Sequence, residues 1–553
     1  MTWGRWRRAA RVAAATALAL ASGWAPAWAV PTAARPAARV ATGAPADAAA
    51  TATDAPQPPR RATARPKPRA TPRASTRTRR TPRPAPAAMV RHRTPRGAAA
   101  LATDLGALLG GHTRRGSWGA LVVSLSRGDT LFAHAPDAAM VPASTMKLFT
   151  AALALDALGP AHSFRTEVLR DGALGSDGVV RGHLILRGDG DPALSPRFVR
   201  GGADAPMALL AQLTAGAGIR RVTGDLIADA TAFEARGIPE GWLTRYAGAS
   251  YAAPFSALSL NENLVVVRVT PGAPGAPPAV AFEPATDGLT VVNSATTVSG
   301  GGGRLSVYGT ADDRILVSGT IGARSAPRRT GVVVGNPPRF TAGAFRAALA
   351  AQGIVVEGTV RVARASPVAA LVATLPSPPL ERLVAVMNRE SINLFAEQLW
   401  RAAARGKEGA GEGSAATAEA ALQRFLTRQV GTAPGAVRAT DGSGLSVLDR
   451  VTPRALVQLL GHAHAAPWGS AFHASLPVAG ESELLRRRMR ATPAQGNLHA
   501  KTGTTNTVVG LSGYVTAENG EVLAFALLYN GTDRGRAREA MDAIGPTMAA
   551  FSR

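Results

Sequence analysis

The chain has 553 residues, no cysteine and a formal net charge of +25. This length exceeds what one hydrophobic core usually serves, so we expect two or three domains. The absence of cysteine excludes a cysteine nucleophile, a thiolate-bound zinc ion and an iron–sulfur cluster. The nine histidines form no His-Glu-x-x-His pattern, so we expect no catalytic metal and no other cofactor.

Residues 1–29 have the pattern of a secretory signal peptide. Four arginines precede an apolar run at 12–21, and Ala27-Trp28-Ala29 fits a small-x-small cleavage site. An uncleaved N-terminal anchor is the alternative. Both interpretations predict an exported protein, either periplasmic or associated with the cell envelope.

Residues 30–97 consist mainly of Ala, Pro, Arg and Thr, with fifteen arginines and lysines against two aspartates. Such a segment buries too little apolar surface to offset its chain entropy, so we predict that it is disordered. Its charge could bind an anionic wall polymer or a membrane surface, or it could be a solvated linker. Nucleic acid is not an expected partner, because the chain is exported and the segment lacks interleaved aromatic residues.

The globular part of the chain begins at residue 98 and divides into three stretches. The first, 98–162, predicts a helix at 99–109, a hairpin at 120–132 and a helix that ends near Gly159-Pro160. The second, 163–335, alternates short apolar runs with Gly, Pro and Asp turns, which indicates a β-rich and mostly antiparallel structure.

The third stretch, 336–553, returns to helical patterns before it ends in strands. Helices are predicted at 341–350, 380–401 with a break at 388–391, 417–429, 451–463 and 536–550, and strands at 508–515 and 521–529. We expect an α+β fold in which the first and third stretches form one antiparallel sheet with helices, interrupted by the inserted β-rich domain or domains.

Ser144 and Lys147 form the first candidate catalytic pair. Residues three apart share a face of a helix, so the lysine amine should lie near the serine hydroxyl. A serine hydroxyl needs a base to become a nucleophile, and a lysine can serve if burial or a second cation lowers its pKa. A serine that only caps the helix is the alternative interpretation.

Two later stretches complete a known signature. Ser391 and Asn393 lie at the break in the helical pattern, and Lys501-Thr-Gly-Thr504 lies on a strand where Gly503 leaves room for close approach. Ser-x-x-Lys, Ser-x-Asn and Lys-Thr-Gly, in this order, are typical of penicillin-binding proteins and class A β-lactamases.

The sequence resembles the DacB-type D-alanyl-D-alanine carboxypeptidase/endopeptidases, which are class C low-molecular-mass penicillin-binding proteins. The resemblance covers about residues 98–553. Beyond the three motifs it rests on the 247 positions between Ser144 and Ser391 and on residues 188–194, 253–258, 441–446, 476–480 and 500–515. It implies a transpeptidase domain like that of penicillin-binding proteins and β-lactamases, interrupted by an insertion.

The resemblance also implies the function and the role of each residue. It implies a serine-type D-Ala-D-Ala carboxypeptidase, also an endopeptidase, that acts on peptidoglycan stem peptides and binds β-lactams. Ser144 would be the nucleophile, Lys147 its base, with a pKa lowered by burial and by Lys501, and Ser391 a proton relay. The residues implied in substrate binding are Asn393, Lys501, Thr502, Gly503 and Thr504, with backbone N–H groups of Ser144 and Thr504 around the oxyanion.

Further positions concern the substrate side chain and the competing functions. Asp229 and Phe233 match a family stretch that reaches toward the substrate. The family commonly has an arginine where this chain has Val447, so recognition of the peptide side chain should differ. The alternatives are a β-lactamase and a catalytically silent wall-binding protein that acts through the basic segment 30–97.

Overall fold

The structure is a computed structural model that describes residues 91–553 except 112, 114, 408 and 410. All of them belong to one compact unit, Pro84–Arg553. The predicted signal peptide and the segment 30–90 lie outside the described residues. Among the helices of the described part, none is both long and apolar enough to cross a membrane.

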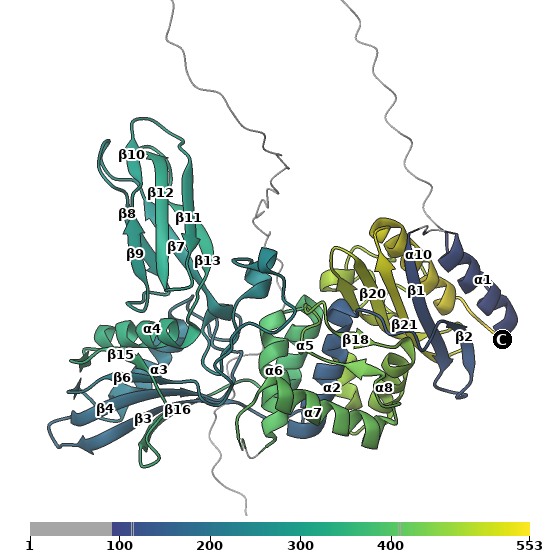
Figure 1. Cartoon of the computed structure of the whole chain (residues 1–553), viewed down its shortest axis with the longest axis horizontal. Helices are drawn as coiled ribbons and strands as arrows, with labels where there is room; N and C mark the ends of the chain where they lie inside the picture. Colours follow the sequence, from purple (N-terminus) through teal and green to yellow (C-terminus); the bar gives the residue numbers. More distant parts are fainter. Residues whose placement is uncertain (1–90, 112, 114, 408, 410) are drawn as a thin grey trace, which may run out of the picture. The chain divides into compact units, whose positions relative to one another are not determined.

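One antiparallel sheet joins the two ends of the described chain. Its strand order is β19-β20-β21-β1-β2, so the first hairpin pairs with the last three strands. The predicted single sheet, built from segments on both sides of an insertion, is therefore confirmed (Figure 1). The strands are β1 (Gly116–Ser124), β2 (Thr130–His134), β19 (His499–Thr504), β20 (Val508–Thr516) and β21 (Val522–Gly531).

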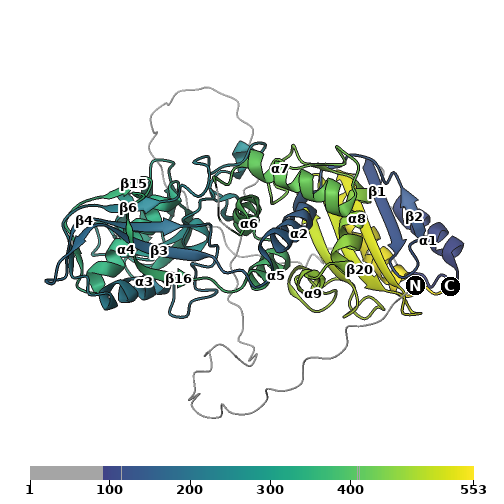
Figure 2. The same ribbon diagram turned by 90° about the horizontal axis from the view of Figure 1, so that it is seen from below.

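Helices cover both faces of this sheet (Figure 2). On one face α1 (Ala98–Gly110) and α10 (Arg534–Ala549) pack on the strands and on each other around an apolar core. The other face is covered by a helical layer with a second core. Its helices are α2 (Lys147–Leu158), α5 (Leu380–Glu390), α6 (Asn393–Arg405), α7 (Ala415–Phe425), α8 (Pro453–Ala465) and α9 (Gly469–Ala474). The short strands β17 (Val437–Arg438) and β18 (Arg450–Val451) pair beside these helices.

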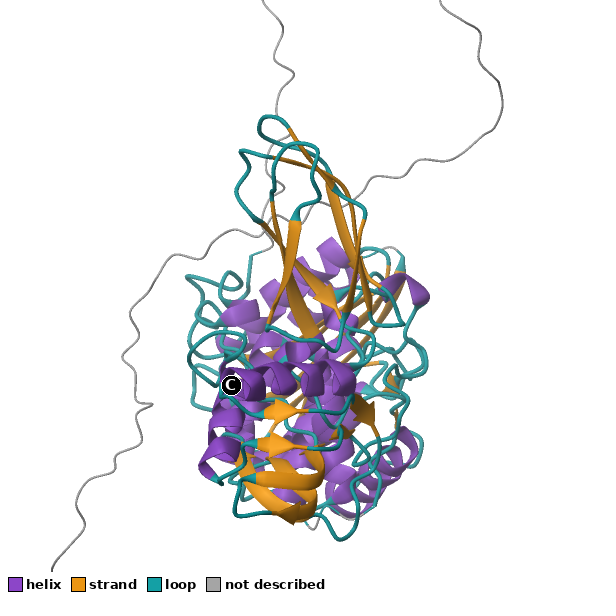
Figure 3. Cartoon of the chain, turned by 90° about the vertical axis from the view of Figure 1, so that its left-hand side faces the viewer, coloured by secondary structure: helices purple, strands orange, loops and turns teal. Residues whose placement is uncertain are grey.

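Between α2 and α5 the chain forms a separate, strand-rich region (Figure 3). Its seven-stranded sheet contains β3 (Arg165–Leu174), β4 (Val179–Gly188), β5 (Arg221–Val222), β6 (Leu226–Asp229), β14 (Val355–Val356), β15 (Val360–Val362) and β16 (Ala370–Pro376). A second sheet contains β7 (Leu264–Thr270), β8 (Ala279–Glu283) and β13 (Arg328–Val333). A third contains β9 (Thr290–Asn293), β10 (Thr296–Val298), β11 (Leu305–Gly309) and β12 (Arg314–Gly322). Its helices are α3 (Ala205–Gly216) and α4 (Pro337–Ala351).

The structure corrects three expectations about this region. The predicted boundary at 335 is wrong, because β14, β15 and β16 pair with β5, β6 and β3, so the insertion continues to Pro376. The helix α3 lies inside the predicted β-rich stretch. Several pairs are parallel rather than antiparallel, among them β4 with β6 and β12 with β9.

A fourth correction concerns the end of the predicted disordered segment. Residues 91–97 are ordered against the C-terminus, where the Arg93 backbone N–H donates to Thr547 Oγ1 at 3.0 Å. The Gly97 N–H donates to the Ser552 carbonyl at 2.7 Å. Composition alone could not reveal this, because the partners lie more than 450 positions away.

Candidate active site

Ser144 lies where the chain enters the buried helix α2. A 3₁₀ helix, Ala143–Met146, leads directly into α2, and the Ser144 side chain makes no capping bond. The preceding Ala143 has φ 48°, a left-handed conformation that is strained for a residue with a Cβ. Ten of the twelve α2 residues are buried, so the helix is a rigid support that holds Ser144 at its N-terminal end.

Lys147 is a fully buried amine with three polar neighbours. Its Nζ lies 3.1 Å from Ser144 Oγ and donates to Asn393 Oδ1 at 2.6 Å and to the Ser443 carbonyl at 2.7 Å. Burial lowers the pKa of Lys147 to about 8, although three nearby carboxyl groups act to raise it.

Ser391 and Asn393 sit at the junction of α5 and α6, as the break in the helical pattern predicted. Ser391 ends α5 in a left-handed conformation with φ 61°, and Asn393 begins α6. The Asn393 side chain bridges two parts of the chain, because its Oδ1 accepts from Lys147 and its Nδ2 donates to the Tyr251 carbonyl at 2.8 Å. The turn therefore presents a hydroxyl and an amide toward Lys147 and Lys501.

Lys501 approaches the same place from strand β19. Its Nζ donates to Ser391 Oγ and to the Thr502 carbonyl, both at 2.9 Å. Burial, assisted by the nearby charge of Lys147, lowers the pKa of Lys501 well below its ordinary value. Two buried lysines thus lie close together, each beside a serine hydroxyl.

The residues after Lys501 bring β19 against the nucleophile. A Cβ on Gly503 would lie 2.8 Å from the Pro142 carbonyl oxygen and 3.3 Å from the Ser144 nitrogen, so a glycine is required for this approach. Thr502 is almost buried, whereas Thr504 is exposed at the end of the strand. The predicted catalytic and substrate-binding groups, apart from Asp229 and Phe233, therefore come together around Ser144.

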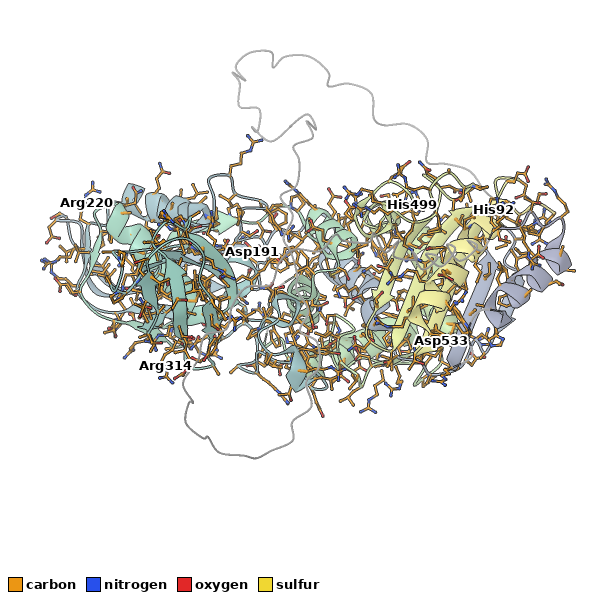
Figure 4. All side chains as sticks on the ribbon, turned by 90° about the horizontal axis from the view of Figure 1, so that it is seen from above. His92, Asp191, Arg220, Arg314, His499 and Asp533 are labelled. Carbon is orange, nitrogen blue, oxygen red and sulfur yellow. The ribbon has the colours of Figure 1, made fainter. Side chains whose placement is uncertain are left out.

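Two histidines lie beside this end of the site. His499, labelled in Figure 4, is two residues before Lys501 on β19, and its ring centroid lies 4.4 Å from that of His473. Burial lowers the pKa of both rings, and that of His473 falls to about 4. Neither ring therefore adds a positive charge beside Lys501 near neutral pH.

Asp229 and Phe233 are placed away from Ser144. The Asp229 carboxylate accepts from the Thr231 N–H and hydroxyl and from the Ala365 N–H. It lines a different cavity, of about 1090 Å³, together with Arg187 and Asp189. The Phe233 ring is buried against Gly190 and Gly413. The Asp229 carboxylate is thus used within the inserted region, and the Phe233 ring packs between that region and the chain that precedes α7.

One contributor to the site had no role in the sequence analysis. The loop 441–446, which is named there only as one of the stretches that carry the family resemblance, supplies the Ser443 carbonyl that binds Lys147. Gly444, with φ +80°, packs so tightly on Ala143 that a Cβ would lie 1.8 Å from the Ala143 carbonyl oxygen. The two glycines in Asp-Gly-Ser-Gly were the available signal, but a backbone contact nearly 300 positions away leaves no pattern in the sequence.

No group of three or more His, Cys, Asp or Glu in the described ranges is arranged to hold a metal ion. The side chains gathered around Ser144 are two serines, two lysines and an amide. A serine–lysine pair at the start of a buried helix, faced by Ser-x-Asn and a Lys-Thr-Gly strand, defines the class of penicillin-binding proteins and serine β-lactamases.

Comparison with known proteins narrows this class to one family. The D-Ala-D-Ala carboxypeptidase 3 (S13) family matches residues 101–550, and the chain belongs to this family. The predicted resemblance to DacB-type carboxypeptidases is therefore confirmed, and the predicted activity, that of a D-Ala-D-Ala carboxypeptidase of the penicillin-binding type, is the activity of its family.

Individual relatives support the assignment. The chain is 35% identical over 450 residues to the D-alanyl-D-alanine carboxypeptidase of Actinomadura sp. (strain R39), covering 78% of this chain and 81% of that protein. It is 28% identical over 403 residues to DacB of Haemophilus influenzae, covering 72% and 81%. The crystal structure of penicillin-binding protein 4 from H. influenzae has a TM-score of 0.67 at 24% identity, covering 80% of this chain and 98% of that one. This last match confirms the predicted fold class.

Proposed function

We propose that the chain hydrolyses the D-Ala-D-Ala end of peptidoglycan stem peptides through an acyl-enzyme on Ser144. The observation that carries this proposal is the Lys147 amine, which is buried and lies 3.1 Å from Ser144 Oγ. With a pKa lowered to about 8, a useful fraction of this lysine is neutral near pH 7 and can accept a proton.

In the first step Ser144 Oγ attacks the carbonyl carbon between the two D-alanines while its proton moves to Lys147. The negative charge that develops on the carbonyl oxygen is stabilised by backbone N–H groups of Ser144 and Thr504. The close approach of β19 to the 3₁₀ helix, which Gly503 permits, supports this pairing of donors.

In the second step the carbon–nitrogen bond breaks and the leaving amine takes up a proton. Ser391 Oγ is held by Lys501 at 2.9 Å, so it can pass a proton from the lysines to the amine. Water then attacks the Ser144 ester and gives a proton to the same groups. They return a proton to Ser144 Oγ as the ester bond breaks, which releases the shortened peptide and restores the serine hydroxyl.

The second lysine, Lys501, is proposed to bind the terminal carboxylate of the substrate. Lys501 is unusually easy to deprotonate in the empty site, and an incoming carboxylate would favour its charged form. Thr502 and Thr504 can add hydroxyl donors, and Asn393 can hold the peptide amide. A carboxypeptidase that selects a free terminal carboxylate requires a cation at this place.

Endopeptidase activity belongs to the same proposal. A peptidoglycan cross-link and a free terminus both present an acyl D-Ala carbonyl, and they differ only in the amine that leaves. The steps at Ser144, Lys147 and Ser391 are unchanged by that difference.

Labelling with a fluorescent penicillin tests the acyl-enzyme. We expect stable labelling of the wild-type protein and none of Ser144→Ala, with Ser126→Ala, which alters a serine in the β1–β2 turn, as the control. A folded wild-type protein that takes no label, or a Ser144→Ala variant that is labelled equally, would refute the mechanism. Product analysis on purified muropeptide monomers and cross-linked dimers then measures the two activities separately.

The remaining alternatives give different results in these assays. A β-lactamase would release hydrolysed penicillin rapidly instead of keeping the label. A wall-binding role of the basic segment 30–97 is supported by its fifteen cationic residues. In that case, wall retention should survive Ser144→Ala, decline with added salt and disappear when residues 30–90 are deleted.

A further inference from the structure

The loop 441–446 is folded around one buried carboxylate, that of Asp441. Five donors converge on it from the loop itself and from the inserted region. Oδ1 accepts from the N–H groups of Ser443 at 2.9 Å and Gly444 at 2.5 Å. Oδ2 accepts from the Ser446 N–H at 2.8 Å, the Ser443 hydroxyl at 3.1 Å and Trp242 Nε1 at 2.7 Å.

The same loop is fixed from outside by two further bonds. The Gly442 N–H donates to Glu397 Oε1 of α6 at 3.1 Å, and Thr150 Oγ1 of α2 donates to the Gly442 carbonyl at 2.6 Å. Gly444 rests on the Ala143 carbonyl. The loop therefore has one position relative to α2, and in that position the Ser443 carbonyl points at Lys147 Nζ.

This carbonyl has a consequence for the direction in which Lys147 accepts a proton. A neutral lysine amine has two N–H bonds and one lone pair. The Ser443 carbonyl and Asn393 Oδ1 accept only, so they take both N–H bonds, at 2.7 and 2.6 Å. The remaining polar neighbour is Ser144 Oγ at 3.1 Å, so the lone pair is left facing the serine hydroxyl. With one acceptor lost, the amine could rotate an N–H toward Ser144 instead.

We propose that Asp441 is a positioning residue, which folds the 441–446 loop so that the Ser443 carbonyl turns the Lys147 lone pair toward Ser144. This inference rests on the proposed role of Lys147 as the base. Asp441 touches neither the serine nor the substrate carbonyl in this scheme, and it acts through a backbone group two residues away.

The charged groups that interact with Lys147 come from three other parts of the chain. Lys501 lies on β19, Glu397 on α6, Asp441 on the 441–446 loop and Asp449 three residues beyond that loop. Burial lowers the pKa of Lys147, and Asp441 is the largest influence in the opposite direction. Burial and the neighbouring Asp441 raise the pKa of Asp449 well above its usual range.

The substitution Asp441→Asn distinguishes this positioning role from a general loss of folding stability. An amide has the same size, but one of its two ends donates, so it cannot accept from all five donors. We expect the limiting rate of acylation by a fluorescent penicillin to fall about 100-fold. Proton transfer from Ser144 requires the Lys147 lone pair to point at the hydroxyl, so a wrongly oriented amine slows the reaction as much as a misplaced one. We also expect the acid limb of the pH–rate profile to move about one unit lower, because Lys147 loses a nearby negative charge.

The matched control is Asp449→Asn, three residues beyond this loop. Asp449 accepts from the Thr440 and Asp441 N–H groups and lies beside the Asp441 carboxyl, but it makes no hydrogen bond to Ser443 or Gly444. Because Asp449 has the smallest influence on the pKa of Lys147 among the three carboxyl groups, its amide should move the acid limb less than Asp441→Asn does and leave the rate within about three-fold of wild type. Equal losses in both variants, or a rate loss in Asp441→Asn with an unmoved acid limb, would show a purely structural role and overturn the proposal.

A gentler variant keeps the test decisive if Asp441→Asn does not fold. Ser443→Ala removes one of the five donors but keeps the carbonyl group, and a rate loss of about three- to ten-fold is expected. A wild-type rate in this variant would overturn the proposal. Failure of the wild-type protein to take label refutes the proposed function itself, whereas a labelled wild type with unaffected variants refutes only the role of Asp441.

Discussion

Lys147, the proposed base, shows how burial lowers the pKa of a residue that is normally protonated. The group is enclosed by α2, α6 and the 441–446 loop, and the cost of burying a charge outweighs the attraction of the nearby carboxyl groups. The Ser443 carbonyl and Asn393 Oδ1 accept both N–H bonds of the neutral amine, so its lone pair faces the Ser144 hydroxyl. The same burial makes the site sensitive to pH.

The first prediction concerns this pH dependence. Acylation requires neutral Lys147, whose pKa is about 8, so the rate should rise with pH and approach its plateau above that value. Stopped-flow labelling between pH 5.5 and 9.5 would measure the acid limb. A rate that is flat from pH 6 to 9 would contradict the assignment of Lys147 as the base.

The second prediction concerns Gly444. In Gly444→Ala the new Cβ would lie 1.8 Å from the Ala143 carbonyl oxygen, in a backbone conformation that already disfavours a side chain. We expect a loss of about 3–5 kcal/mol in the free energy of unfolding and a large loss of penicillin labelling. Both are measured on the same sample, by thermal denaturation and by gel fluorescence.

Gly435 provides the control for that change. It has φ +78°, almost the same as Gly444, but a Cβ there would meet nothing within 4 Å. Gly435→Ala should therefore cost only about 1–2 kcal/mol and leave labelling intact. Equal effects in the two variants would mean that backbone strain, and not contact with the segment of Ser144, determines the loss.

At the scale of elements, α2 connects the catalytic serine to the core. Leu155 lies in the centre of this helix and is fully buried in the larger core cluster. We expect Leu155→Ala to reduce the free energy of unfolding by about 2–5 kcal/mol through the cavity it leaves. Denaturant titration would show this, and Leu213→Ala on α3, where the side chain is 41% exposed, should change the value by less than about 1 kcal/mol.

The elements around the site were largely predictable from the sequence. Apolar periodicity predicted α1, α2, α8 and the strands β20 and β21, and the polar run 388–391 predicted the break that places Ser391. Local pattern carries this information, because each of these elements buries one face or is buried completely.

What could not be predicted depends on contacts between distant residues. The strands β14 and β15 have two and three residues, too few to show an alternation, so the insertion was ended 41 residues early. Asp229 was selected by its similarity to a family stretch, but its oxygens are used by Thr231 and Ala365. The contact of Ser443 with Lys147 uses a carbonyl group that every residue possesses, so the sequence carries no mark of it.

At the scale of the whole molecule, one buried arginine joins the inserted region to the helical layer. Arg401 of α6 is 1% exposed, pairs with Glu397 and with Glu234 of the insertion, and stacks over Phe255 at 3.6 Å. Such a group is costly to bury, but removing it alone leaves the carboxylates without their partner.

We therefore expect Arg401→Met to destabilise the protein by about 3–5 kcal/mol, because Glu397 remains buried and unpaired. The double variant Arg401→Met with Glu397→Gln should recover part of the loss. Arg454→Ala, which breaks an exposed pair with Asp137, should change stability by less than about 1 kcal/mol. Calorimetry compares the three variants, and an equal loss for the exposed pair would contradict this account.

The pairing of β1 with β21 determines when the enzyme can complete its folding during synthesis. Gly116 faces Gly531 in this ladder, so the central sheet cannot close until nearly the whole chain has been made. Sheets with such distant pairing fold slowly. A nascent chain that has emerged as far as residue 500 already holds Ser144, Lys147, Ser391 and Asn393, but it has no strand to carry Lys501. We therefore expect that the incomplete chain does not react with penicillin during synthesis. Labelling should begin only when the last strands have joined the sheet, so its appearance would mark the final step of folding.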